Sequence, residues 1–174
     1  MEHLRRPLAA LALVGLLLSL VVNVTAWCGV SLPEACPALW SLHVGLFVVF
    51  IPFVIVFRKS FGRKPSFSRL KTLLPPWVFA TFVTLFVYVF INFALAMWTL
   101  KDGGPAIREG QYVIANHGHV VRSITAAEYQ AAQAAAARAF SGHWLIFYFV
   151  PFVFFAFALP AMRLEAMREG RPRP

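Results

Sequence analysis

Four polar side chains lie near the ends of long apolar stretches of this sequence, where they could do chemistry. They are Asn23, His43, Asn92 and His143. Polar groups are costly in apolar surroundings, so they commonly mark either a ligand site or hydrogen bonds between helices. If the apolar stretches pack together as helices, the four side chains can form one polar layer. The layer predicts either hydrogen bonds between helices or a small-molecule site.

Histidine is the cofactor-binding residue type in this set. His43 and His143 lie on different apolar stretches and could be axial ligands of a b-type haem. His117 and His119 form an H-x-H pair that could bind a metal ion together with His143. Gly118 stands between the pair and is typical of a turn, which can point the two rings apart. Haem and metal stay open as alternatives to a layer without a cofactor.

Motifs of the common enzyme classes are missing. The sequence has no G-x-S-x-G, no H-E-x-x-H and no P-loop, so the usual nucleophile, zinc and phosphate sites are not indicated. No charged residue lies in the middle of an apolar stretch, which argues against ion-coupled pumping. General acid–base chemistry would rest on His117, His119 or His143. The pattern leans away from an enzyme.

The elements that must position these residues are four charge-free stretches. A helix that spans a membrane needs about 20 apolar residues, and each stretch is longer than that. The sequence therefore predicts an all-α integral membrane protein with four transmembrane helices. The charge-free stretches cover residues 7–33, 35–57, 72–100 and 139–162, and the predicted helices cover about 8–27, 38–57, 76–98 and 142–162.

Basic residues are distributed unevenly between the connecting segments. Segment 58–75 carries six Lys and Arg residues and no acid, and segments 1–7 and 163–174 are also basic. Lys and Arg are retained on the cytoplasmic side of membranes. We therefore expect both termini and segment 58–75 in the cytoplasm, and segments 28–37 and 99–141 outside.

The net charge of +9 also needs an explanation. Basic residues beside membrane helices are accounted for by orientation and by contact of segment 58–71 with anionic lipid. No nucleic-acid-binding motif is present, so nucleic acid is not expected as a partner. The composition is rich in Ala and favours Arg over Lys, which is typical of GC-rich bacterial genomes. The expected location is a bacterial inner membrane.

The first apolar stretch and the loop after it raise two questions of processing. Val24-Thr25-Ala26 could pass as a signal-peptidase site, but the length of the stretch favours an uncleaved helix. Cys28 and Cys36 lie in the same outer loop. In an oxidising compartment they could form a short disulfide, and the alternative is two free thiols.

Segment 99–141 has the composition of a water-exposed structure. Gly103-Gly104-Pro105 reads as a turn or linker. Two runs rich in β-formers, 111–115 and 119–124, predict a β-hairpin around Asn116-His117-Gly118. Thr125 and Glu128 then fit a capping box that starts a helix through an alanine-rich stretch to about Phe140. Ser141-Gly142 is expected to break this helix from the next one.

Two prolines fall inside predicted transmembrane helices. Pro52 and Pro151 each remove a backbone donor, so both should kink or unwind their helices.

These features favour a non-enzymatic accessory, assembly or immunity-type protein. It would bind another membrane or envelope protein, or a second copy of itself, through the outer hairpin and helix. Strand edges supply backbone hydrogen bonds for such contacts. Tyr112, Ile114 and Tyr129 are the residues expected to contact the partner. The competing class is a membrane protein that binds a cofactor or small molecule at the polar layer.

Overall fold

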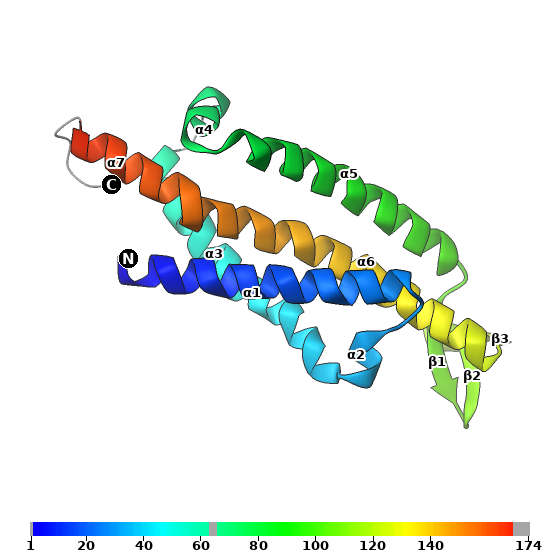
Figure 1. Cartoon of the computed structure of the whole chain (residues 1–174). Helices are drawn as coiled ribbons and strands as arrows, with labels where there is room; N and C mark the ends of the chain where they lie inside the picture. Colours follow the sequence, from blue (N-terminus) through cyan, green and yellow to red (C-terminus); the bar gives the residue numbers. More distant parts are fainter. Residues whose placement is uncertain (1, 63–65, 169–174) are drawn as a thin grey trace.

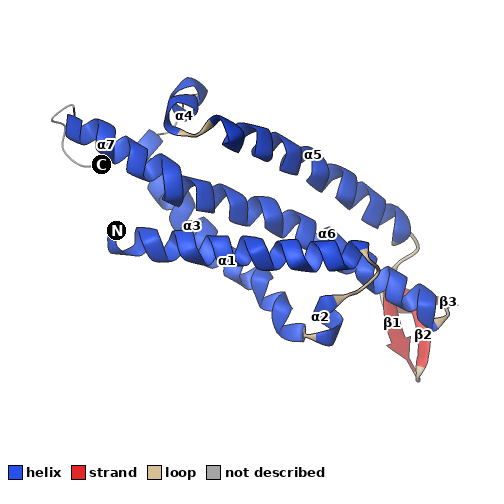
Figure 2. Cartoon of the chain, in the orientation of Figure 1, coloured by secondary structure: helices blue, strands red, loops and turns tan. Residues whose placement is uncertain are grey.

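The computed structural model describes residues 2–62 and 66–168, and this part of the chain is mostly helical (Figures 1 and 2). Four helices within these residues are long and apolar enough to cross a membrane, and a small three-stranded sheet lies in the connection between the third and the fourth. The four are α1 (Glu2–Trp27), α3 (Ser41–Phe61), α5 (Pro76–Thr99) and α6 (Ala126–Val153), the last continuing through η2 (Phe154–Ala158) into α7 (Leu159–Arg168).

Helix α6 is the centre of the bundle. It packs against α1, α5 and α3 (Figure 1). Its side chains are mostly covered by the other helices, whereas α5 keeps most of its apolar surface exposed. An exposed apolar helix face is expected in a protein whose solvent is lipid. These features describe a multi-pass membrane protein by length, composition and surface.

Tyr148 of α6 anchors the contact between α1, α3 and α6. The side chain is buried, and its hydroxyl donates a 2.7 Å hydrogen bond to the carbonyl oxygen of Leu42. The ring lies directly against Gly15 of α1, and its hydroxyl lies 2.7 Å from where a Cβ of Gly45 of α3 would be. Small residues at such contacts let membrane helices approach closely. Two glycines therefore set the spacing of three helices.

The predicted break at Ser141-Gly142 is wrong, because α6 runs without interruption from Ala126 to Val153. The Ser141 hydroxyl donates to the carbonyl oxygen of Arg138 in its own helix, 3.3 Å away. Gly142 is buried against Asn92 of α5. The two residues serve close packing between helices, which their sequence preference for helix ends does not reveal.

The two helix prolines behave differently. Pro52 lies inside α3, which stays α-helical from Ser41 to Phe61, so the predicted unwinding does not occur there. Pro151 lies just before the π-helical turn η2. A π-helical turn is found where the regular series of i→i−4 backbone hydrogen bonds is interrupted. In η2 the carbonyl oxygen of Phe155 accepts a hydrogen bond from Arg5 Nη1, 3.2 Å away.

The sheet contains the predicted hairpin and one strand more. Strands β1 (Gly104–Arg108), β2 (Gln111–Asn116) and β3 (His119–Ser123) are antiparallel in the order β1-β2-β3. Both turns have two residues with positive φ, Glu109-Gly110 and His117-Gly118, as type I′ hairpins require. Segment 103–105 is thus not merely a linker. Gly104 pairs with Ala115, and a Cβ on Gly103 would collide with the Ala115 backbone.

Short helices occupy two of the connections. The first connection contains α2 (Leu32–Ala35) and η1 (Pro37–Trp40). Cys28 and Cys36 flank α2, and both are exposed free thiols. The helical turn fills the segment between them, so the predicted disulfide has no support. The second connection contains α4 (Phe67–Leu73), capped by Ser66, whose hydroxyl accepts from the backbone of Arg69.

Candidate functional site

Asn23 of α1 and Asn92 of α5 meet on the backbone of α6. Both side chains are almost completely buried. The Nδ2 of Asn92 donates to the carbonyl oxygen of Arg138 at 2.8 Å, and the Nδ2 of Asn23 donates to the same oxygen at 3.3 Å and to the Ser141 hydroxyl at 3.0 Å. One helix carbonyl therefore joins three helices. This arrangement confines the rotation of α1 and α5 about α6.

A chain of aromatic donors continues this polar layer toward the surface. The Trp27 indole N–H donates to the Tyr88 hydroxyl at 2.7 Å, and the Tyr88 hydroxyl donates to Oδ1 of Asn23. The Arg138 guanidinium lies 4.0 Å from the centre of the Trp27 ring, within the range of a cation–π interaction. The Trp27 indole and the Arg138 guanidinium thus cover the end of the layer that is nearest to the molecular surface.

Gly142 explains how Asn92 comes so close to α6. A Cβ at this position would collide with Nδ2 of Asn92 and lie 3.3 Å from its Cγ. Any larger residue would push the amide off the Arg138 carbonyl. The glycine is therefore part of the site.

Two buried polar atoms in the layer lack a hydrogen-bond partner within the described residues. They are Oδ1 of Asn92, an acceptor, and Nε of Arg138, a donor. Buried polar groups are nearly always paired with protein, water or ligand. The described side chains that hydrogen-bond within the layer are amides, hydroxyls and an indole.

The two histidines expected in the layer lie outside it. His143 Nδ1 is 2.8 Å from the carbonyl oxygen of Ala139 in its own helix, and its ring packs edge-on against Phe93. His43 is exposed on α3, and its Nδ1 accepts a 3.1 Å hydrogen bond from the Trp144 indole. The imidazoles are held by different neighbours. Nothing in this placement favours their joint ligation of a haem.

The H-x-H pair is on the surface of the sheet. His117 occupies the β2–β3 turn with a φ of 48°, and His119 begins β3. Both are exposed, and His143 lies in the bundle. Within residues 2–62 and 66–168, no group of three or more His, Cys, Asp or Glu side chains is placed to hold a metal ion.

The residues expected to contact a partner are mostly inside the outer cap, defined here as β1–β3 and the first turns of α6. Ile114 and Tyr129 are buried, and the Tyr129 ring packs 4.7 Å from that of Tyr112. Both side chains lie where the sheet packs on α6, so little of their surface is exposed, and their contact with a partner stays a prediction. Tyr112 is partly exposed. The sheet also exposes Ile107, Val120 and Val121, each to a greater extent than Tyr112.

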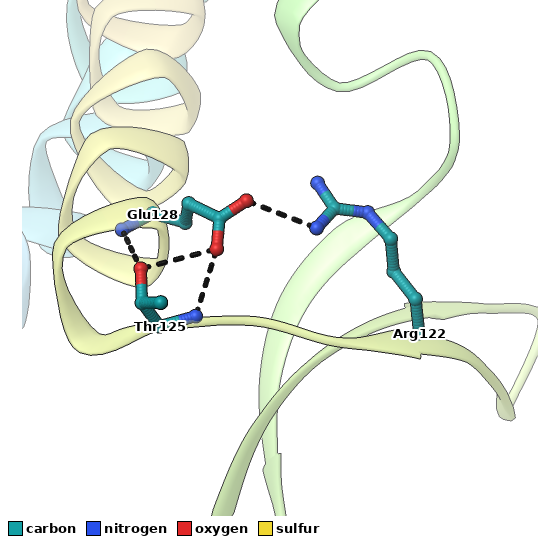
Figure 3. Close-up of polar contacts among 3 residues, drawn as sticks. All are labelled: Arg122, Thr125 and Glu128. Atoms are coloured by element: carbon teal, nitrogen blue, oxygen red, sulfur yellow. Dashed lines mark hydrogen bonds and ion pairs between the residues drawn. The ribbon is translucent and has the colours of Figure 1, made fainter.

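The capping box predicted at the start of α6 is confirmed, and it also ties the sheet to the helix (Figure 3). Glu128 Oε2 accepts from the Thr125 backbone N–H at 2.8 Å, and Oε1 accepts from Arg122 of β3 at 3.0 Å. The Thr125 backbone bond, followed by the Arg122 bond, lowers the pKa of the Glu128 carboxyl below its usual value. One carboxylate thus caps the helix and holds β3.

A long apolar cleft runs along α6 between α3 and α5. The part next to α4, called here the inner part, has a volume of about 310 Å³. The part that extends to Phe93 and His143, called here the outer part, has a volume of about 440 Å³. Phe82 and Val150 line both parts. Among the described residues, His143 is the one polar residue on the wall of the outer part, and those that line the inner part are all apolar.

Sequence reasoning missed Tyr88, Arg138 and Ser141 as members of the polar layer. A usable signal existed for Arg138, because it immediately precedes the last charge-free stretch. The role of its carbonyl oxygen leaves no trace in the sequence, since every residue has one.

No protein-family model matches this chain, and neither a curated protein nor a solved structure is found to be similar to it. These comparisons therefore assign no function to the chain.

Proposed function

We propose that this chain is an accessory protein of a bacterial inner membrane that docks a partner protein on strand β3. In this proposal the four long helices span the bilayer with both termini in the cytoplasm, because segment 58–75 is the most basic connection. The sheet then lies outside the cytoplasm. The partner is another membrane or envelope protein, or a second copy of the chain.

The observation that carries the proposal is the free edge of β3. Within the described residues β3 pairs with β2 alone, and all five of its residues are exposed. The opposite strand, β1, packs near α6. An unpaired strand edge presents a row of backbone donors and acceptors that a second strand can complete.

The side chains of β3 suit a protein partner. Val120 and Val121 are each about half exposed. Soluble sheet edges are usually protected by charged side chains or by a covering element. Arg122 is turned instead to Glu128 and holds the strand in place. The edge is therefore anchored and carries two adjacent exposed valines.

Site-specific photo-crosslinking in native membranes tests the proposal. A photoreactive residue at Val121 should yield one discrete adduct, while the same residue at Ile107, which is equally exposed on β1, should not. Val120→Lys should abolish the Val121 adduct, since a charge on the edge opposes strand pairing.

The adduct's mass identifies the partner class. A doubling of the 19.5 kDa chain would identify a second copy, and another mass would identify a different protein. Equal adducts from Val121 and Ile107, or none from either, would reject the docking role.

A second candidate is binding of a small polar molecule in the layer around Asn92. The unpaired Oδ1 of Asn92 and Nε of Arg138 favour it. Native mass spectrometry of the purified protein, combined with an absorption spectrum and metal analysis, tests this candidate. A bound molecule lost in Asn92→Val would support it. A Soret band lost in His43→Ala or His143→Ala would instead establish haem, and a bare polypeptide mass would reject both.

A further inference from the structure

The inner part of the apolar cleft has a shape and chemistry that suit a hydrocarbon chain. Its wall is made by α3, α4, α5, α6 and η2, and the described residues that line it all have apolar side chains. Rings dominate the lining, among them Phe53, Phe57, Phe79, Phe82 and Phe154. Close helix–helix association in membranes favours small residues that let backbones approach. A wall of bulky rings with space between them favours a flexible chain as the occupant over a partner's helix.

The length of this inner part matches one leaflet of a bilayer. Its lining on α6 and η2 extends from Phe149 to Ala158, a distance of about 14 Å at about 1.5 Å per residue. The hydrocarbon core of a bilayer is about 30 Å thick, so one leaflet contributes about 15 Å. The cleft is thus about as deep as a single acyl chain reaches.

Positive charge is concentrated at one end of this cleft. Leu70 of α4 lines the cleft, and its neighbours Arg69 and Lys71 are exposed on the same short helix. Arg58 and Lys59 lie in the last turn of α3, and Lys59 lines a separate pocket beside Leu4 and Leu8 of α1. No Asp or Glu lies between residues 58 and 75. At the far end, the outer part of the cleft is lined by no Lys or Arg among the described residues.

We propose that the inner cleft is a binding site for one anionic phospholipid of the cytoplasmic leaflet. One acyl chain lies between α3, α5 and α6, and the phosphate contacts the basic end of α4. Charge complementarity selects an anionic head group, and the matching depth selects a leaflet lipid. The site rests on the orientation proposed above, with segment 58–75 in the cytoplasm, but it does not depend on partner docking on β3, so the two proposals can fail separately.

Electron paramagnetic resonance of spin-labelled lipids in nanodiscs tests this site. The full chain is reconstituted with phosphatidylglycerol or phosphatidylcholine that carries the label near the end of one acyl chain. The wild-type protein should immobilise a fraction of phosphatidylglycerol and prefer it to phosphatidylcholine. Each basic residue near an anionic surface contributes roughly fivefold in affinity, so Arg69→Gln with Lys71→Gln should lower the preference at least fivefold.

Matched variants distinguish binding at this site from non-specific electrostatic attraction of anionic lipid to basic residues. Arg6→Gln with Arg168→Gln removes the same charge from the same expected face of the membrane and should leave the preference unchanged. Leu70→Trp fills the cleft and should abolish the immobilised component for both lipids, with Phe57→Trp as a second filling variant. Circular dichroism confirms that each variant is folded.

Three results would overturn the proposal. They are a wild-type protein without an immobilised lipid, an equal loss of preference in the charge control, and immobilisation that persists in both folded filling variants.

Discussion

Substitution of Gly15 by Ala tests whether Tyr148 sets the spacing of α1 and α6. A Cβ on Gly15 would lie 2.5 Å from both Cδ1 and Cζ of the buried Tyr148 ring, and still closer to Cε1. Favourable contacts between carbon atoms lie at about 3.5–4.0 Å. The added methyl group therefore overlaps three ring atoms by about 1 Å or more. Either α1 must move away or the ring must leave its place.

The expected cost follows from two opposing effects. Overpacking a well-filled contact costs typically about 1–3 kcal/mol, and the overlap with three atoms of a buried ring places Gly15→Ala near the upper end. Ala is favoured over Gly in a helix by about 1 kcal/mol. We therefore expect a net loss of about 2 kcal/mol in the free energy of unfolding. The Tyr148 hydroxyl bond to Leu42 would also be disturbed.

Reversible unfolding of the detergent-solubilised protein by sodium dodecyl sulfate measures this loss. The decisive control is the same change in a Tyr148→Ala background, where the clash no longer exists. There Gly15→Ala should be neutral or stabilising by up to about 1 kcal/mol. A substitution that is harmless in the wild-type background, or equally harmful in both, would refute the proposed contact.

Four further predictions concern the polar layer and the cap. Gly142→Ala should lower the melting temperature, at a cost of about 1–3 kcal/mol, because the methyl group displaces the Asn92 amide from α6; an unchanged melting temperature would contradict this. Asn23→Val should cost about 0.6–2 kcal/mol in the unfolding assay, since its hydrogen bonds to α5 and α6 are lost; a more stable variant would show that the layer does not serve packing. Thr125→Ala should cost about 1 kcal/mol and raise hydrogen exchange in the first turns of α6. The pKa of Glu128 is lowered in the folded state. The stability that its carboxylate gives to the start of α6 is therefore complete above the usual pKa of 4.5 and is lost as the pH falls through the folded pKa. Protection of these turns, taken as the ratio of the intrinsic to the measured exchange rate at each pH, should therefore fall in acid, and a protection that is insensitive to acid would refute the role of the carboxylate.

The sequence by itself determined those features that depend on neighbouring residues. Four helices of sufficient length and apolarity, the hairpin around Gly118 and the capping box of Thr125 and Glu128 were all predicted. Each is a local preference: apolar run length, a backbone conformation that Gly allows, and a side chain within reach of its own first turn. Such preferences act whatever the rest of the chain does.

Tertiary structure decided everything that depends on how helices are rotated and spaced. Ser141-Gly142 has the composition of a helix end, but packing against Asn92 keeps α6 continuous. Two helix prolines look alike in sequence, and η2 forms near one of them alone. These outcomes depend on which neighbour fills the space beside a residue.

The polar residues make the same point most sharply. Asn23 and Asn92 meet on the Arg138 carbonyl, while His43 and His143 bind elsewhere, although all four occupy comparable places in their apolar stretches. Side chains one position apart on a helix point about 100° from each other. A small rotation of a helix therefore decides whether a polar group joins the layer, and only the packed bundle determines that rotation.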